Sequence, residues 1–113
     1  MLCPRLVSAL AAALVLGVHA PAFAAGDAAR GKVISYTCLG CHGIEGYRNA
    51  YPDYSVPRLA GQSATYIVAA LKEYKSGARS HPSMRAIAGS LSDADIADLA
   101  AYYAQGGVKT ASQ

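Results

Sequence analysis

Apolar residues recur at helical spacing in residues 64–76 and 93–105, and this pattern predicts two amphipathic helices. A further helix is predicted over residues 27–36, and no segment has the pattern of a convincing strand. The predicted fold class is therefore all-α, with three main helices. The apolar faces consist of Tyr66, Ile67, Ala70, Leu71 and Tyr74 in the second helix, and of Ile96, Leu99, Ala100 and Tyr103 in the third.

Local signals mark the ends of these helices. Asp27 stands where a helix start favours an acidic residue. Ser63 is a good N-cap, and Ser92 with Asp95 resembles a capping box. Gly77 is suited to end the second helix.

Gly31 lies inside the first helix, where glycine costs roughly 1 kcal/mol relative to alanine. We therefore expect another helix to cross closely at this glycine.

The segments between the helices are long for so small a domain. Residues 43–62 show no helical pattern, and structureless loops of about twenty residues are unusual in compact domains. Residues 77–90 are expected to form a second loop. Three short helices also supply little apolar material for a core, so both features predict a large apolar cofactor around which the loops fold.

The first 24 residues have the layout of a secretory signal peptide. Arg5 is followed by an apolar run over residues 6–18 and by an A-x-A cleavage site at residues 22–24. The run of about 13 residues is shorter than the roughly 20 that span a bilayer. We expect a signal peptide at 1–24 and one domain at 25–113, exported to the bacterial periplasm without stable membrane insertion; a retained anchor is the alternative.

The charge and composition exclude some classes of function. The net charge of +3 over 113 residues is spread along the chain, which is not the footprint of a nucleic-acid-binding protein. No Ser-His-Asp set and no carboxylate pair with a clear role is found, so we do not expect an enzyme. In an oxidising compartment the two cysteines of the exported domain must be disulfide-bonded, metal-bound or covalently capped.

Residues 38–42, Cys-Leu-Gly-Cys-His, form a C-x-x-C-H motif, the attachment signature of c-type haem. At this spacing Cys38 and Cys41 can each add to one vinyl group of the same porphyrin. His42 then falls beneath the iron as the proximal ligand. The motif predicts one covalent haem c.

Three other interpretations of the cysteines remain. A thioredoxin-like dithiol site is expected in a βαβ context, which the pattern lacks. A zinc site could use Cys38, Cys41, His42 and His81, although the adjacent positions of Cys41 and His42 suit one tetrahedral ion poorly. The third is a structural disulfide.

The chain resembles class I c-type cytochromes. Residues 26–32, Gly-Asp-Ala-Ala-Arg-Gly-Lys, followed by the C-x-x-C-H motif, resemble the start of that family. Residues 57–62, 75–79, Met84 and residues 91–93 are similar to bacterial periplasmic cytochromes c, and most of all to one half of the di-haem proteins. The resemblance implies the three-helix cytochrome c fold and electron transfer. The chain departs from the di-haem pattern in having one haem motif, so the surface between two haem domains is not available to it.

The resemblance also implies roles for individual residues. It maps the sixth iron ligand onto Met84, a thioether donor that raises the potential; His81 is the alternative. It implies that the Pro57 carbonyl accepts the proton on the outer nitrogen of His42. Arg58, Arg79 and some of Tyr47, Tyr51 and Tyr54 could hold the haem propionates, although surface exposure or core packing explains each equally well.

The expected function is one-electron transfer in a respiratory chain. The partners would be redox proteins, a periplasmic donor and a terminal oxidase or reductase, and the protein would be a monomeric shuttle. One alternative is a fixed cytochrome subunit of a periplasmic dehydrogenase. The other is a haem sensor or peroxidase with an open iron, against which Met84 argues.

Overall fold

The computed structural model describes residues 25–107, so the predicted signal peptide lies outside the described residues. The elements in chain order are α1 (Ala28–Ile34), α2 (Tyr36–His42), β1 (Arg48–Ala50), β2 (Asp53–Ser55), α3 (Ala64–Ser76), α4 (Pro82–Gly89) and α5 (Asp93–Ala104). Between residues 25 and 107 no helix has the length and hydrophobicity to cross a bilayer.

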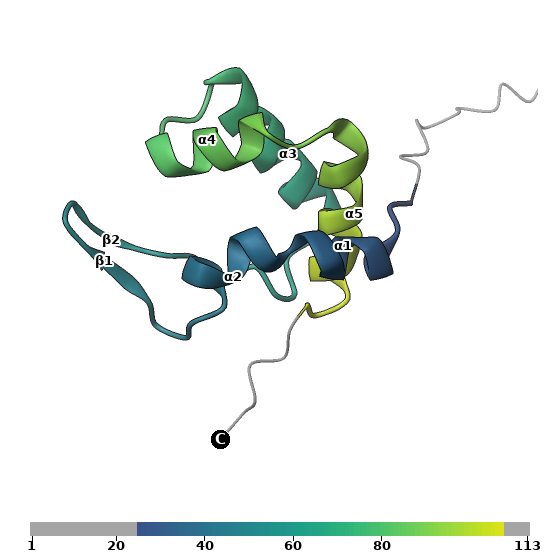
Figure 1. The fold of residues 1–113 in the computed structure, drawn as a ribbon, viewed down its shortest axis with the longest axis horizontal. Helices are drawn as coiled ribbons and strands as arrows, with labels where there is room; N and C mark the ends of the chain where they lie inside the picture. The colour runs from purple at the N-terminus through teal and green to yellow at the C-terminus, as the bar shows by residue number, and fades with distance from the viewer. Residues whose placement is uncertain (1–24, 108–113) are drawn as a thin grey trace, which may run out of the picture.

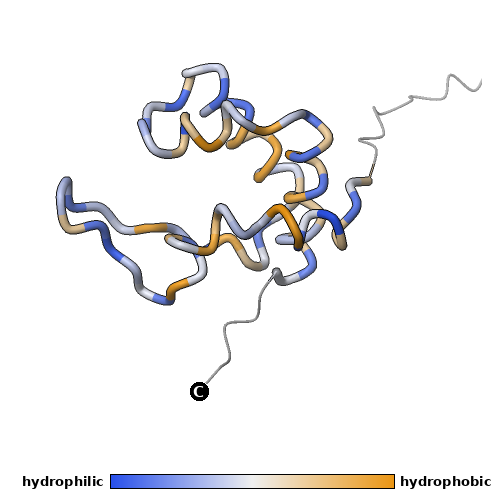
Figure 2. The backbone as a smooth tube through the Cα atoms, viewed as in Figure 1, coloured by the Kyte–Doolittle hydropathy of each residue, from blue (hydrophilic) through white to orange (hydrophobic). Residues whose placement is uncertain are grey.

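The helices pack in a series. α1 packs against α5, α5 against α3, and α3 against α4. In Figure 1, α3 and α4 lie on one side and α2 with the β1–β2 hairpin on the other, joined at one end by α1 and α5. Figure 2 shows that hydrophobic stretches lie mainly on the helices.

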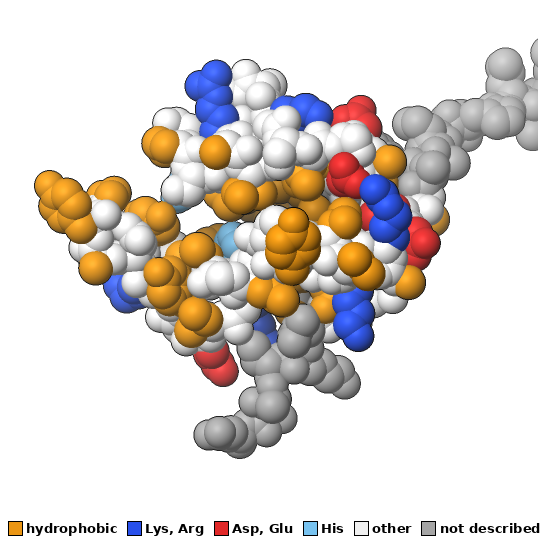
Figure 3. Space-filling view, in the orientation of Figure 1, with side chains coloured by type: hydrophobic (Ala, Val, Ile, Leu, Met, Phe, Trp, Pro, Cys, Tyr) orange, Lys and Arg blue, Asp and Glu red, His pale blue; other side chains and the backbone are white. Residues whose placement is uncertain are grey.

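A hollow opens between these two sides, and we call it the crevice. Figure 3 shows that hydrophobic side chains line much of the crevice and that histidine is visible within it. The hydrophobic core lies mainly on α3 and α5, beyond one end of this hollow. It consists of Ile67, Val68, Ile96, Leu99, Ala100, Tyr102 and Tyr103.

The predicted close crossing at Gly31 is confirmed. A Cβ atom on Gly31 would lie 2.1 Å from the backbone oxygen of Asp98 and 2.9 Å from Cβ of Tyr102. Only a residue without a side chain allows α1 to approach α5 so closely.

The predicted caps are also confirmed. Ser63 Oγ accepts from the backbone N–H of Tyr66 at 3.2 Å, and α3 ends at Gly77 with φ of 85°. Asp27 caps α1, and Ser92 and Asp95 form a complete capping box on α5.

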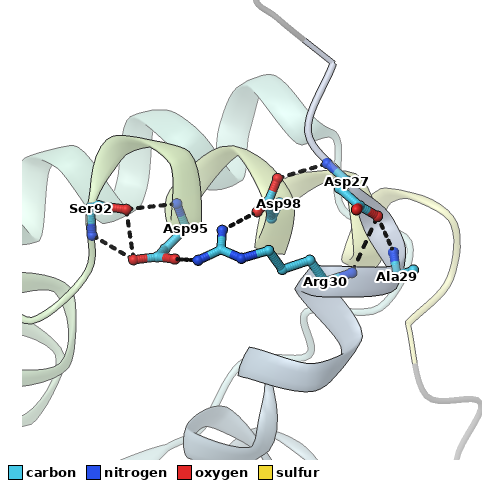
Figure 4. A network of polar contacts seen from close by, with 6 residues as sticks. All are labelled: Asp27, Ala29, Arg30, Ser92, Asp95 and Asp98. Atoms are coloured by element: carbon cyan, nitrogen blue, oxygen red, sulfur yellow. Dashed lines mark hydrogen bonds and ion pairs between the residues drawn. The ribbon is translucent and has the colours of Figure 1, made fainter.

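A polar network joins α1 to the start of α5 (Figure 4). The buried Asp98 carboxylate accepts from the backbone N–H of Asp27 at 2.7 Å and from the Arg30 guanidinium. Arg30 also pairs with Asp95 at 2.6 Å. Hydrogen bonds from the Ser92 side chain and backbone, and then from Arg30, lower the pKa of Asp95 to about 2.

The helix predicted over residues 27–36 corresponds to α1, which ends at Ile34, and a second helix that was not predicted, α2, follows after Ser35. The Ser35 hydroxyl is buried and donates to the backbone oxygen of Lys32 at 2.7 Å. This local bond gives the backbone an alternative to the helical pattern. The break separates α2, which carries the C-x-x-C-H motif, from α1.

Two expected loops contain regular structure. Residues 43–62 hold the antiparallel hairpin, in which Arg48 pairs with Ser55 and Asn49 with Tyr54. Residues 77–90 hold α4, with Pro82 at its first turn and only Ala88 buried. These elements bury so little that apolar periodicity could not reveal them.

Candidate functional site

α2 places the two cysteines one helical turn apart. Cys38 is half-buried against the hydrophobic core, and Cys41 is exposed. Both are free thiols, and residues three apart share a helix face. The two sulfur atoms are thus available together on one side of α2.

His42, the last residue of α2, is oriented by Pro57. Its Nδ1 lies 2.6 Å from the backbone oxygen of Pro57. Since a carbonyl oxygen can only accept, the neutral ring carries its proton on Nδ1. The lone pair on Nε2 is then free to bind a metal.

A pocket of about 70 Å³ lies beside His42, and Leu39, Pro57, Arg58 and Tyr103 are among its lining residues. The Tyr103 hydroxyl is buried and has no hydrogen-bond partner in the described part of the chain. Burial, with the nearby Cys38 thiol as a second cause, raises the pKa of Tyr103 well above its usual range. A buried, unpaired hydroxyl beside α2 leaves room for an interaction with a bound group.

Both candidates for the sixth ligand lie at the start of α4, one in its first turn and one at its N-cap. Met84 is half-buried in the first turn of α4. His81 is the N-cap, and its Nδ1 accepts from the backbone N–H of Met84 at 3.3 Å. The lone pair on this ring nitrogen is therefore already engaged by the backbone.

The His81 ring also makes aromatic contacts that could not be predicted from the sequence. It meets the Tyr54 ring edge-to-face, with centroids 4.8 Å apart and planes at 82°. A second edge-on contact, at 6.3 Å, is made with Tyr74 of α3. His81 thus contacts both the hairpin and α3.

The two arginines expected to hold the propionates have different surroundings. Arg58 is exposed beside the His42 pocket. Arg79 lies over the Tyr74 ring at 4.9 Å and donates to the Tyr66 hydroxyl at 3.4 Å.

The three tyrosines of the hairpin region also differ from one another. Tyr51 is 96% exposed at the hairpin turn. Tyr47 is half-buried, and Tyr54 packs on His81. Only Tyr47 and Tyr54 are therefore placed to contribute to an enclosed site.

A second pocket of about 530 Å³ lies between the turn before α4 and the outer face of that helix. Arg79, His81 and Arg85 are among its lining residues. On α4 the lining positions Pro82, Arg85, Ala86 and Gly89 lie on the side away from Met84.

The donor set fits a covalent haem better than zinc. Within residues 25–107 no group of three or more His, Cys, Asp or Glu residues is placed to hold a metal ion. Two thiols on one helix face, an imidazole with a free Nε2 and a crevice lined by hydrophobic side chains together match the chemistry of a haem c site.

Comparison with known proteins gives a consistent result. The family model described as Cytochrome c matches residues 28–106. Cytochrome c-554(548) from Halomonas halodenitrificans is 49% identical over 82 residues, which cover 70% of this chain and 95% of that protein. Cytochrome c4 from Pseudomonas aeruginosa is 42% identical over 91 residues, covering 80% of this chain but only 44% of that protein. The chain thus spans about half the length of that cytochrome c4.

Among solved structures, thiosulfate dehydrogenase from Marichromatium purpuratum is similar with a TM-score of 0.62 and 32% identity. The match covers 84% of this chain and 22% of that one.

Proposed function

The chain belongs to the cytochrome c family, whose members carry haem c, and from this premise we propose that it is a periplasmic one-electron carrier. In this proposal Cys38 and Cys41 would hold the haem, and His42 and Met84 would bind its iron. The observation that carries the proposal is the 2.6 Å contact between His42 Nδ1 and the Pro57 carbonyl, next to two free thiols on the same helix.

When bound, the haem would supply one-electron redox chemistry. The protein orients the iron ligands and surrounds the group with hydrophobic side chains. Pro57 fixes the orientation of the His42 ring and keeps Nε2 unprotonated, which also makes the imidazole a better donor. The hydrophobic side chains of the crevice exclude water and favour the less charged ferrous state.

Met84 suits the distal position. It lies in the first turn of the short helix α4, on the α3 side of the crevice, whereas His42 ends α2 on the other side. A thioether opposite an imidazole stabilises ferrous iron and gives a high potential. Arg58 beside the His42 pocket and Arg79 near α4 are the cations proposed to hold the propionates.

The periplasmic location rests on the predicted signal peptide and on the chemistry of the cysteines. Members of the cytochrome c family are generally electron carriers and not enzymes. The proposed partners are therefore redox proteins, a donor and an oxidase or reductase, and no reaction on a small substrate is assigned.

A second candidate function is a cytochrome subunit bound to a periplasmic dehydrogenase. The likeness to thiosulfate dehydrogenase, which covers 84% of this chain, favours it. Size-exclusion chromatography of the protein from its native periplasm separates the two. A free carrier elutes as a monomer, whereas a subunit elutes with a larger dehydrogenase.

Haem attachment tests the proposal. We expect periplasmic protein to have the mass of residues 25–113 plus one haem, and to keep the haem through acid-acetone extraction and denaturing electrophoresis. The double variant Cys38→Ala, Cys41→Ala should lose covalent haem, whereas Cys38→Ala alone should keep a single weaker linkage. Bound zinc or a Cys38–Cys41 disulfide, in a host competent for haem attachment, would refute the proposal.

A further inference from the structure

We infer that His81 is a positioning residue, which holds Met84 at the iron by joining α4 to the hairpin and to α3. This inference rests on the proposed ligation by Met84. In this role His81 does not bind the iron itself. It controls how often Met84 dissociates from the iron.

The first support is the helix cap. His81 Nδ1 accepts from the Met84 backbone N–H at 3.3 Å, and the His81 backbone oxygen accepts from Arg85 at 2.8 Å. Both bonds fix the first turn of α4, where Met84 lies. Histidine is not among the favoured N-caps, which are Ser, Thr, Asp and Asn, so capping alone does not account for a ring at this position.

The second support is what the ring contacts. Tyr54 packs edge-to-face on His81 at 4.8 Å, a favourable aromatic geometry. Tyr54 belongs to β2, and the chain reaches Pro57, the hydrogen-bond partner of His42, three residues later. The contact therefore links the segment that orients the proximal ligand to the helix that carries the distal one.

The third support is the weakness of α4 by itself. It has eight residues, and only Ala88 is buried. Isolated helices of this length are unstable, so α4 depends on its cap and its neighbours. If the contacts of His81 are lost, the first turn of α4 opens more often and Met84 leaves the iron more often.

The test measures the rate at which cyanide binds to the ferric holoprotein, because cyanide enters only when Met84 leaves. His81→Asn keeps a side-chain cap and loses the ring, whereas His81→Phe keeps a ring and loses the acceptor. Tyr54→Ala removes the hairpin partner and leaves the cap intact. We expect each variant to bind cyanide roughly fivefold to thirtyfold faster than wild type.

Ser63→Ala is the matched control. It removes a cap of similar length, 3.2 Å, from α3. It should lower the stability to denaturant about as much as His81→Phe, with a change in the cyanide rate below about twofold. If His81→Asn, His81→Phe and Tyr54→Ala bind cyanide no faster than Ser63→Ala, His81 does not position Met84.

Measurements on the wild-type protein distinguish a failure of this inference from a failure of the proposed function. If wild type binds cyanide as fast as Met84→Ala and lacks the red charge-transfer band of an iron–thioether bond, the Met84 ligation itself is wrong. If wild type has the band and binds slowly, but the His81 and Tyr54 variants do so as well, only the role of His81 is wrong.

Discussion

Single residues decide how closely α1 meets α5. Gly31 lets the two helices touch through their backbones, and the buried carboxylate of Asp98 satisfies the N–H of Asp27 at the start of α1. This crossing holds α1, and with it the following helix that carries the cysteines. Residues at the crossing of α1 and α5 thus set the position of the proposed haem-binding residues.

Gly31→Ala should strongly destabilise the protein. Its Cβ would lie 2.1 Å from the backbone oxygen of Asp98, so α1 and α5 would have to separate. We expect a loss of about 1–3 kcal/mol or more in the free energy of unfolding, measured by urea denaturation of the holoprotein.

Gly89→Ala is the control for Gly31→Ala, because a Cβ at this helical glycine meets nothing within 4 Å. It should leave the stability unchanged or raise it by up to about 1 kcal/mol. Equal effects of the two substitutions would contradict the close crossing.

At the scale of elements, prediction from sequence succeeded where a helix buries a face. α3 and α5 were predicted within one residue at each end, because apolar residues such as Ile67 and Leu71 in α3, and Ile96 and Leu99 in α5, recur at helical spacing and caps mark the helix ends. The predicted face was wrong in one detail, since Tyr66 is exposed and Val68, which was not assigned to it, is buried.

α4 and the hairpin bury almost no side chains, so the pattern of apolar residues along the chain does not predict them. The local signal for α4, Pro82 at the first helical position, was present and would have found it. The break between α1 and α2 at Ser35 depends on one buried hydroxyl, and the spacing of apolar residues does not predict such a break.

The network between α1 and α5 predicts a pH dependence. The pKa of Asp95 is lowered to about 2 by Ser92 and Arg30, whereas an unfolded aspartate titrates near about 3.9. Between these values the unfolded chain binds more protons than the native one, so stability falls as the pH falls from about 4 to about 2.

Asp95→Asn should remove this contribution at all pH values. Its unfolding free energy should therefore decline less steeply than that of wild type across the same window, as measured by denaturant titrations at a series of pH values. Parallel curves for the two proteins would show that Asp95 does not contribute through its charge.

At the scale of the whole molecule, two sides enclose a crevice and a small core lies at one end. The motif alone is enough to propose Cys38, Cys41 and His42 as the haem-binding residues, and the contact between His42 and Pro57 could be predicted from the family resemblance. The contact of His81 with Tyr54 could not, because a ring pair 27 positions apart along the chain leaves no local pattern.

The reduction potential tests the central claim most directly. Voltammetry of the purified holoprotein should give one reversible wave with the one-electron slope of about 59 mV per decade. Met84→His should fold and keep its haem, and its potential should be lower, because imidazole favours ferric iron more than a thioether does. Tyr36→Phe, at an exposed position on α2, should leave the potential unchanged. A wild-type protein with no reversible one-electron wave, or a potential that Met84→His does not lower, would contradict the claim that this is a histidine–methionine electron carrier.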